Sequence, residues 1–173
     1  MKKRILYTLV ISILFSIALS CQERKGKALE IPFERRISDS VGLLTIDQKN
    51  NLFGLIKDLD STVGAQIAIV IIDTLGGKQI NDVSLAVGEK LNLGRQKYRD
   101  GLLIFFSYKD HKVRIEVGYG LERIIKDEIA SRIIREKIKP RFKKQEYYEG
   151  FSAAILEINE LIKENKELIG KYH

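Results

Sequence analysis

The sequence predicts an α/β protein, arranged as a three-layer α/β/α sandwich around a small mixed sheet. Residues 66–72 and 101–107 are short, continuous apolar runs, which is typical of strands buried on both faces. A segment with helical spacing separates them, and a strand–helix–strand order implies a parallel, right-handed crossover. Residues 112–117 alternate strictly and follow directly, so they predict a hairpin that makes the sheet mixed.

The first helix is expected between Thr45 and Gly64. Thr45 and Gln48 have the spacing of a capping box, in which two side chains satisfy free backbone N–H groups at a helix start. Apolar side chains then recur at helical spacing, at Leu52, Leu55, Ile56, Leu59 and Val63. Gly64 is a suitable stop because glycine readily adopts the left-handed conformation that ends many helices.

The crossover between the two buried strands contains the second helix. A loop at residues 73–78 with two glycines precedes it. Its apolar face consists of Val83, Ala86, Val87 and Leu91. The hairpin that follows the crossover turns at residues 108–111.

Two further helices are expected after the hairpin. Asp127 is the expected N-cap of the first, which carries Ile129, Ile133 and Ile134 and would end by Pro140. The second runs from about Glu146 to Lys163. Its inward side chains are Phe151, Ala154, Ile155, Ile158, Leu161 and Ile162. Helices on both faces of the sheet complete a Rossmann-like arrangement.

The N-terminus has the anatomy of an export signal. Met1 is followed by Lys2, Lys3 and Arg4, and then by an uncharged run at residues 5–20 that is short for a membrane span. Residues 18–21 resemble a bacterial lipobox, so we expect a signal peptide at residues 1–20 and a lipid on Cys21. The alternative is an uncleaved N-terminal anchor. Both place the domain outside the cytoplasm, in the cell envelope, facing the periplasm or on the outer membrane.

The rest of the chain divides into a polar tether at residues 21–36, a domain at residues 37–165 and a polar tail at residues 166–173. The whole chain of 173 residues has a net charge of +7. Removal of Lys2, Lys3 and Arg4 would leave 27 basic and 23 acidic residues, a net charge of +4. A single Cys excludes an internal disulfide and, with two His, the common zinc sites.

A candidate site lies where strand ends meet. In the predicted sheet, the end of segment 112–117 lies beside the start of segment 101–107, which gathers Asp100, Glu122 and Asp127 around a glycine-rich turn. Oxygen ligands without His or Cys suit Ca²⁺ or another divalent cation. The expected ligand-binding loop consists of Gly101, Gly118, Tyr119 and Gly120. The alternative is that Asp100 belongs to a turn, Asp127 to a helix cap, and Glu122 to the solvated surface.

Other charged residues have simpler interpretations. Glu116 is expected on the wet face of its strand, paired with Arg114. His111 lies in a hairpin turn and is not expected to be catalytic. Residues 132–144 contain seven basic residues and one acid, Glu136, which favours an anionic membrane or an acidic partner. The alternative is a solvated helix face, and nucleic acid is not an expected partner outside the cytoplasm.

Several segments together resemble the TPM-domain family, which includes thylakoid-lumen and photosystem II repair proteins. The matching segments are residues 39–44, 64–70, 100–103 and 114–122, followed by residues 133–136, Pro140 and residues 148–151. The run from Ile115 to Glu122 is specific, and the resemblance covers Ile37 to Leu161. It implies an α/β/α sandwich and an extracytoplasmic, membrane-associated accessory protein that maintains membrane complexes. Weak phosphatase activity and calcium binding, attributed to some members, are also implied.

The sequence departs from this family at two points. Arg99 precedes Asp100, where many relatives have two acidic or amide residues, so one ligand of the implied metal site is missing. Many bacterial relatives end in a transmembrane helix and a glycine-rich tail, whereas here we expect anchoring through Cys21. Our leading hypothesis is a lipid-anchored accessory protein that binds membrane lipid through Cys21 and envelope membrane proteins through its domain. The alternative is a weak metal-dependent acid phosphatase that uses Asp100, Glu122 and Asp127.

Overall fold

The computed structural model describes residues 36–171, which belong to one compact unit. The expected signal peptide, Cys21 and residues 22–35 of the tether lie outside this range. The strands and α-helices are β1 (Ile37–Asp39), α2 (Ile46–Val63), β2 (Gln66–Ile72), α3 (Ile80–Leu91), β3 (Gly101–Ser107), β4 (Lys112–Val117), α4 (Asp127–Ile133), α5 (Lys139–Phe142) and α6 (Tyr147–Glu164). None of these described helices is long and apolar enough to span a membrane.

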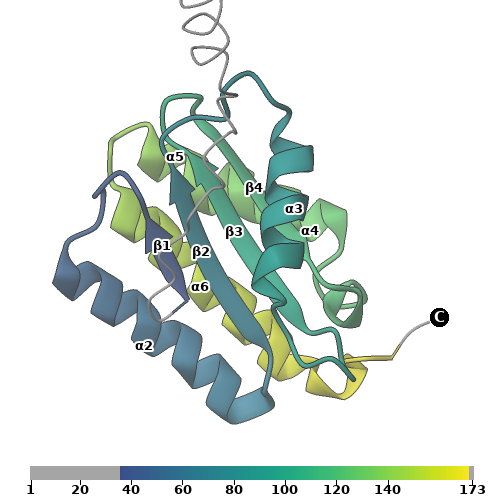
Figure 1. Cartoon of the computed structure of the whole chain (residues 1–173). Helices are drawn as coiled ribbons and strands as arrows, with labels where there is room; N and C mark the ends of the chain where they lie inside the picture. The colour runs from purple at the N-terminus through teal and green to yellow at the C-terminus, as the bar shows by residue number, and fades with distance from the viewer. Residues whose placement is uncertain (1–35, 172–173) are drawn as a thin grey trace, which may run out of the picture. The chain divides into compact units, whose positions relative to one another are not determined.

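The four strands lie in the order β1-β2-β3-β4 (Figure 1). Strands β1, β2 and β3 are parallel, and β4 is antiparallel to β3, as the predicted crossover and hairpin require. β2 and β3 pair along their whole length, from Gln66 opposite Gly101 to Ile72 opposite Ser107. Strand β1 is absent from the predicted elements because three residues are too few to show a pattern.

Helices cover both faces of the sheet. α3 lies against one face, while α2 and α6 pack together against the other (Figure 1). The main core lies on the α2–α6 side. Its strand residues are Ile67, Ile69, Ile71, Leu102, Ile104 and Phe106. Burial of each large aliphatic side chain contributes about 2 kcal/mol relative to exposure to water. The predicted α/β fold with a small mixed sheet is confirmed.

Both ends of α2 are capped as expected. The Thr45 hydroxyl accepts a hydrogen bond from the Gln48 N–H at 3.2 Å, and the Gln48 amide oxygen accepts one from the Thr45 N–H at 3.0 Å. At the other end, Gly64 has a φ of 82° and donates its N–H to the carbonyl of Asp60 at 2.8 Å. The capping box and the glycine stop therefore set the two ends of this helix.

The start of α4 differs by one residue from the expectation. Lys126 stands at the N-cap and makes no side-chain hydrogen bond there, so Asp127 is not the cap. Asp127 is the first residue of the helix, followed by Glu128. Both carboxylates lie in the first turn, where negative charge interacts favourably with the helix dipole.

The helix α4 ends at Ile133, before Pro140 as expected, but helical turns continue past Pro140. After α4 the chain forms a π-helical turn, η2 (Ile134–Ile138), in which the N–H of Lys139 donates to the carbonyl of Ile134. Such a turn contains one more residue than an α-helical turn. Pro140 then lies in the first turn of α5, where a missing N–H costs little.

The C-terminal segment is joined to the domain, although a polar tail is expected there. A 3-10 turn, η3 (Lys166–Leu168), follows α6, and both Leu168 and Ile169 pack against the core. The N–H of Gly170 donates to the carbonyl of Gly120 at 3.0 Å. The end of the described chain therefore covers the turn after β4.

Candidate functional site

The glycine-rich turn after β4 lies beside the start of β3, as the predicted strand order requires. The N–H of Gly118 donates to the carbonyl of Gly101 at 2.8 Å, and that of Gly120 to the carbonyl of Arg99 at 3.0 Å. The turn continues into a 3-10 helix, η1 (Tyr119–Leu121). The structure therefore brings the expected loop residues together at one end of the sheet.

The glycines of this corner let one stretch of backbone pack directly against another. A Cβ atom on Gly120 would lie 1.7 Å from the carbonyl oxygen of Tyr98, and one on Gly101 would lie 2.4 Å from that of Leu93. Neither position has room for a larger residue. Tyr119, in contrast, has 62% of its surface exposed. In this loop, Tyr119 is thus available to a ligand, while the glycines serve the packing.

Asp100, an expected metal ligand, is fully buried and engaged within its own loop. Its Oδ2 lies 2.8 Å from Nε of Arg95, and its Oδ1 accepts a hydrogen bond from the backbone N–H of Arg95 at 2.7 Å. The same guanidinium donates to the carbonyl of Val63 at 3.0 Å. The carboxylate therefore fixes the connection between α3 and β3 to the end of α2.

The three expected metal ligands do not converge. Glu122 and Asp127 line a common groove, but Asp100 is turned into the Arg95 loop. Across residues 36–171, no three His, Cys, Asp or Glu side chains are grouped so that they could hold a metal ion. The pairing of Asp100 with Arg95 is the physical reason, because a carboxylate with both oxygens bonded to one partner has little left for a cation.

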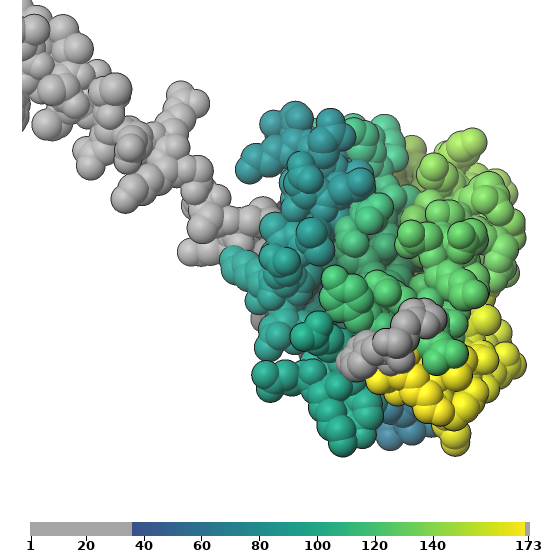
Figure 2. Space-filling model, turned by 90° about the vertical axis from the view of Figure 1, so that its right-hand side faces the viewer, coloured from purple at the N-terminus to yellow at the C-terminus, as the bar shows by residue number. Residues whose placement is uncertain are grey.

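The groove has a volume of about 550 Å³ and lies between α3 and β4. Figure 2 views this side, with α3 in teal next to the green segment that contains β4. Leu85 of α3 and Tyr119 form exposed apolar walls, with 55% and 62% of their surfaces accessible. Tyr119, Glu122 and Asp127 also line a neighbouring hollow of about 690 Å³.

The groove is acidic, although the chain as a whole is basic. Its carboxylates are Glu89, Glu116, Glu122 and Asp127, and its single cation is Arg114. The expected pair of Arg114 and Glu116 is confirmed, with Nε and Oε1 2.5 Å apart. Glu116 is not on a wet face, however, because α3 covers it and the Ser84 hydroxyl donates to the same Oε1 at 2.5 Å. Arg114 therefore balances the charge of the Glu116 carboxylate, and Arg114 and Ser84 together hold it in place.

The basic segment at residues 132–144 is partly neutralised within the domain. Glu157 of α6 lies 2.6 Å from Arg132 and 3.1 Å from Lys137. Burial by itself raises the pKa of Glu157, but Lys137 and Arg132 outweigh this and hold it below the usual value. Arg135 pairs with Glu136 at 2.9 Å. These contacts tie the π turn to α6, while Lys139, Lys143 and Lys144 remain exposed.

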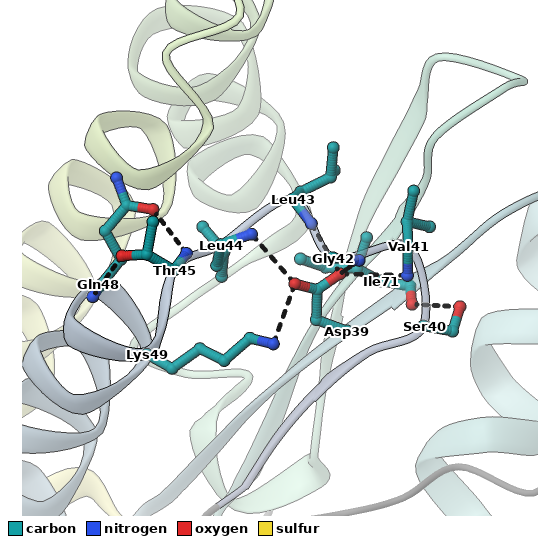
Figure 3. A network of polar contacts seen from close by, with 10 residues as sticks. All are labelled: Asp39, Ser40, Val41, Gly42, Leu43, Leu44, Thr45, Gln48, Lys49 and Ile71. Carbon is teal, nitrogen blue, oxygen red and sulfur yellow. Dashed lines mark hydrogen bonds and ion pairs between the residues drawn. The ribbon is translucent and has the colours of Figure 1, made fainter.

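Asp39 is a buried charge that does not figure among the predicted site residues. Its Oδ1 accepts hydrogen bonds from the N–H groups of Val41, Gly42 and Leu43 at 3.2, 2.9 and 3.2 Å, and its Oδ2 accepts one from Leu44 at 3.0 Å (Figure 3). Lys49 lies 3.2 Å from the same Oδ2. Burial by itself raises the pKa of Asp39. The hydrogen bonds and Lys49 together lower it by more than burial raises it, so the pKa lies below its usual value.

The role of Asp39 is to shape the connection from β1 to α2. An Asp followed by small or turn-forming residues is the available sequence signal, since Asp side chains bond the backbone shortly after them. The sequence from Asp39 to Gly42 fits this pattern. The site lies at the carboxyl end of β1, the end of the sheet opposite to the glycine-rich corner.

Comparison with known proteins identifies the family. A family model described as the TPM domain, and named for a TPM phosphatase, matches residues 37–161. The chain belongs to the TPM-domain family. No curated protein matches it.

Solved structures share the fold. The N-terminal domain of a protein from P. gingivalis is 28% identical, with a TM-score of 0.71, over 82% of this chain and 89% of that chain. The BA42 protein from Bizionia argentinensis is 18% identical, with a TM-score of 0.62, over 70% and 82%. The N-terminal domain of the cg2496 protein from Corynebacterium glutamicum is 10% identical, with a TM-score of 0.59, over 72% and 78%.

Proposed function

We propose that this protein is an extracytoplasmic, lipid-anchored accessory protein whose TPM domain binds membrane-protein partners of the cell envelope. The groove between α3 and β4 is the proposed binding surface. The observation that carries this proposal is the pair of exposed apolar side chains, Leu85 and Tyr119, on the walls of one open groove. Large apolar side chains that remain exposed around a groove are a common mark of binding sites.

A photocrosslinking experiment in intact cells tests the binding surface. A photoreactive amino acid is placed at position 85 or 119, and at Ile46 as the matched control. Ile46 is also a large exposed apolar residue, 79% accessible, but it lies at the start of α2, away from the groove. Crosslinks to envelope proteins are expected from positions 85 and 119 and not from 46. Equal crosslinking from all three positions would contradict the proposal.

The proposed anchor rests on the sequence around Cys21. The expected lipid, such as palmitate or another acyl chain, would hold the mature domain at the membrane. Cys21→Ser should move the protein from the membrane fraction to the soluble fraction and abolish labelling with a clickable palmitate analogue. Unchanged membrane association with no labelling of the wild type would favour the uncleaved anchor instead.

A second candidate function is a metal-dependent phosphatase. Two observations favour it: the family model carries a phosphatase name, and Glu122 and Asp127 line one groove. With Asp100 engaged by Arg95, only Glu122 and Asp127 of the three expected ligands would hold a divalent cation such as Ca²⁺, which would polarise a phosphate ester and activate water. Calorimetric titration with Ca²⁺ and release of phosphate from an ester test it. Loss of both in Glu122→Gln and Asp127→Asn, with retention in the exposed control Glu149→Gln, would support this function.

A further inference from the structure

We propose that the partner enters the groove as an extended, basic peptide segment that adds a fifth strand to the free edge of β4. This inference rests on the proposed function, because it specifies how the same groove would be occupied. It commits to one occupant, a segment of another protein with Lys or Arg side chains. Binding through strand addition combines main-chain hydrogen bonds with side-chain pockets.

The first step of the argument is that β4 has a free edge. The order of the described sheet is β1-β2-β3-β4, so β4 has a strand neighbour on one side only. An edge strand presents backbone N–H and C=O groups that can pair with another chain. In the described sheet no strand pairs with this edge of β4, and β4 also lines the groove with the exposed apolar walls.

The register identifies the backbone groups that would bond. Gly118 donates its N–H to Gly101, and hydrogen-bonded pairs alternate along an antiparallel ladder. The N–H and C=O groups of Glu116, Arg114 and Lys112 therefore point toward β3. Those of the intervening residues, Val113, Ile115 and Val117, point to the free edge. An added strand would form hydrogen bonds with the backbone N–H and C=O groups of these three residues. The hydrogen bonds of Lys112, Arg114 and Glu116 to β3 would stay as they are.

The groove lies along the second half of β4. Residues Arg114 to Gly118 line it, as do Gly101 to Leu103 of β3, and Glu122 and Asp127 line it beyond the strand. Because β4 is the last strand of the described sheet, the groove lies next to its unpaired edge. Leu85, Gly88 and Glu89 of α3 form the opposite wall. Gly88 has no side chain, and a Cβ atom there would contact only Leu103 of β3, at 3.8 Å.

Charge complementarity selects a basic occupant. The groove carries the carboxylates of Glu89, Glu122 and Asp127 in addition to the pair of Arg114 and Glu116. Its net charge is thus negative on a chain whose net charge is +7. These carboxylates favour Lys or Arg side chains and disfavour anionic lipid headgroups in the groove itself, whereas Arg123, Lys126 and Lys171 line the neighbouring hollow.

Amide hydrogen exchange at single-residue resolution tests the proposal on the full chain in lipid nanodiscs. The probe is an acetylated, amidated eight-residue peptide in which Lys and Val alternate. With this peptide, the amides of Val113, Ile115 and Val117 should exchange at least about tenfold more slowly. The amides of Arg114 and Glu116, already bonded to β3, should not change. Protection of neither set at millimolar peptide would overturn the proposal.

Two control peptides separate strand addition from simple charge attraction. A peptide N-methylated at alternate residues keeps every charge but cannot donate hydrogen bonds to β4, so it should lose binding and protection. A peptide with Glu in place of Lys should not bind. Equal binding of the N-methylated peptide would overturn strand addition. Protection that rises with protein concentration without peptide would also overturn it, because a second copy would then be the occupant.

A variant of the protein tests the charge argument. The double variant Glu122→Lys, Asp127→Lys should weaken peptide binding about tenfold, whereas the control Glu149→Lys, Glu160→Lys, with exposed residues of α6, should not. Unchanged affinity in the first variant would overturn the basic occupant. Crosslinks from Tyr119 without protection of β4 would leave the proposed function standing and reject strand addition. Absence of both would reject the two together.

Discussion

The carboxylate of Asp100 is enclosed by Arg95, five residues earlier, through Nε at 2.8 Å and the backbone N–H at 2.7 Å. The Asp100 side chain is completely buried, while that of Arg95 is 38% exposed. The pair closes the loop between α3 and β3 on itself. The pair holds the loop next to the glycine-rich corner. It also engages both oxygens of Asp100, so this carboxylate is not free to bind a metal ion.

Asp100→Asn should lower the free energy of unfolding by about 2–3 kcal/mol, because the new amide leaves a buried donor facing the guanidinium. Urea denaturation measures this. The control is Asp73→Asn, which breaks the exposed pair of Asp73 and Lys109, 2.7 Å apart, and should cost less than about 1 kcal/mol. If Asp100→Asn folds with normal stability yet loses Ca²⁺ binding, Asp100 is a metal ligand after all.

Gly120→Ala should be severely destabilising, by about 3 kcal/mol or more, because its Cβ would stand 1.7 Å from the Tyr98 carbonyl oxygen. The backbone of two segments would have to separate. Gly54→Ala is the matched control: Gly54 is exposed in α2 and a Cβ there meets nothing within 4 Å. That change should raise stability by about 0.5–1 kcal/mol through helix propensity. Thermal unfolding of both variants distinguishes the two, and a similar shift in both would contradict this account.

Asp39 should make stability depend on pH in the acidic range. Its pKa in the folded protein is lowered from 3.8, so its contribution is present above that value and is lost as the pH falls through the lower, folded pKa. Asp39→Asn should therefore cost about 2 kcal/mol at pH 7 and progressively less below pH 4. Urea denaturation of wild type and variant at several pH values measures the difference. A difference that stays constant down to pH 2 would show that the charge is not responsible.

Thr45→Ala should cost about 1 kcal/mol, since it removes the hydroxyl that accepts the Gln48 N–H at the start of α2. Thr62→Ala is the control near the other end of the same helix. The Thr62 hydroxyl donates to the Asp58 carbonyl, which is already part of the helix, so its loss should have little effect. Chemical denaturation compares the two variants, and equal losses would argue against a specific role of the cap.

Most of the fold follows from patterns that are local in the sequence. The continuous apolar strands β2 and β3 and the capped helix α2 have strong local signals, and the structure contains each of them. Strand β1 and the π turn η2 lack such signals. β1 is held by pairing with β2, and η2 by the packing of Ile134 and Ile138 at the core, which are tertiary effects.

Only part of the candidate site can be predicted from the sequence. Strand order brings Glu122, Asp127 and the glycine-rich turn to one corner, and this requires only the parallel and antiparallel pairings. The capture of Asp100 by Arg95 depends on the path of an irregular loop, which no periodic pattern encodes. The groove itself depends on the distance between α3 and β4, which is a tertiary feature that no local pattern encodes.

The network around Asp39 also occupies the carboxyl end of β1. In sheets with parallel strands, ligands commonly bind beyond the carboxyl ends of the strands, where successive backbone N–H groups can form a nest for an anion. Here the nest at residues 41–44 is filled by the chain's own Asp39. The carboxylate of Asp39 thus occupies the position that a bound anion would take at this end of the sheet, while the groove proposed for partner binding opens at the opposite end.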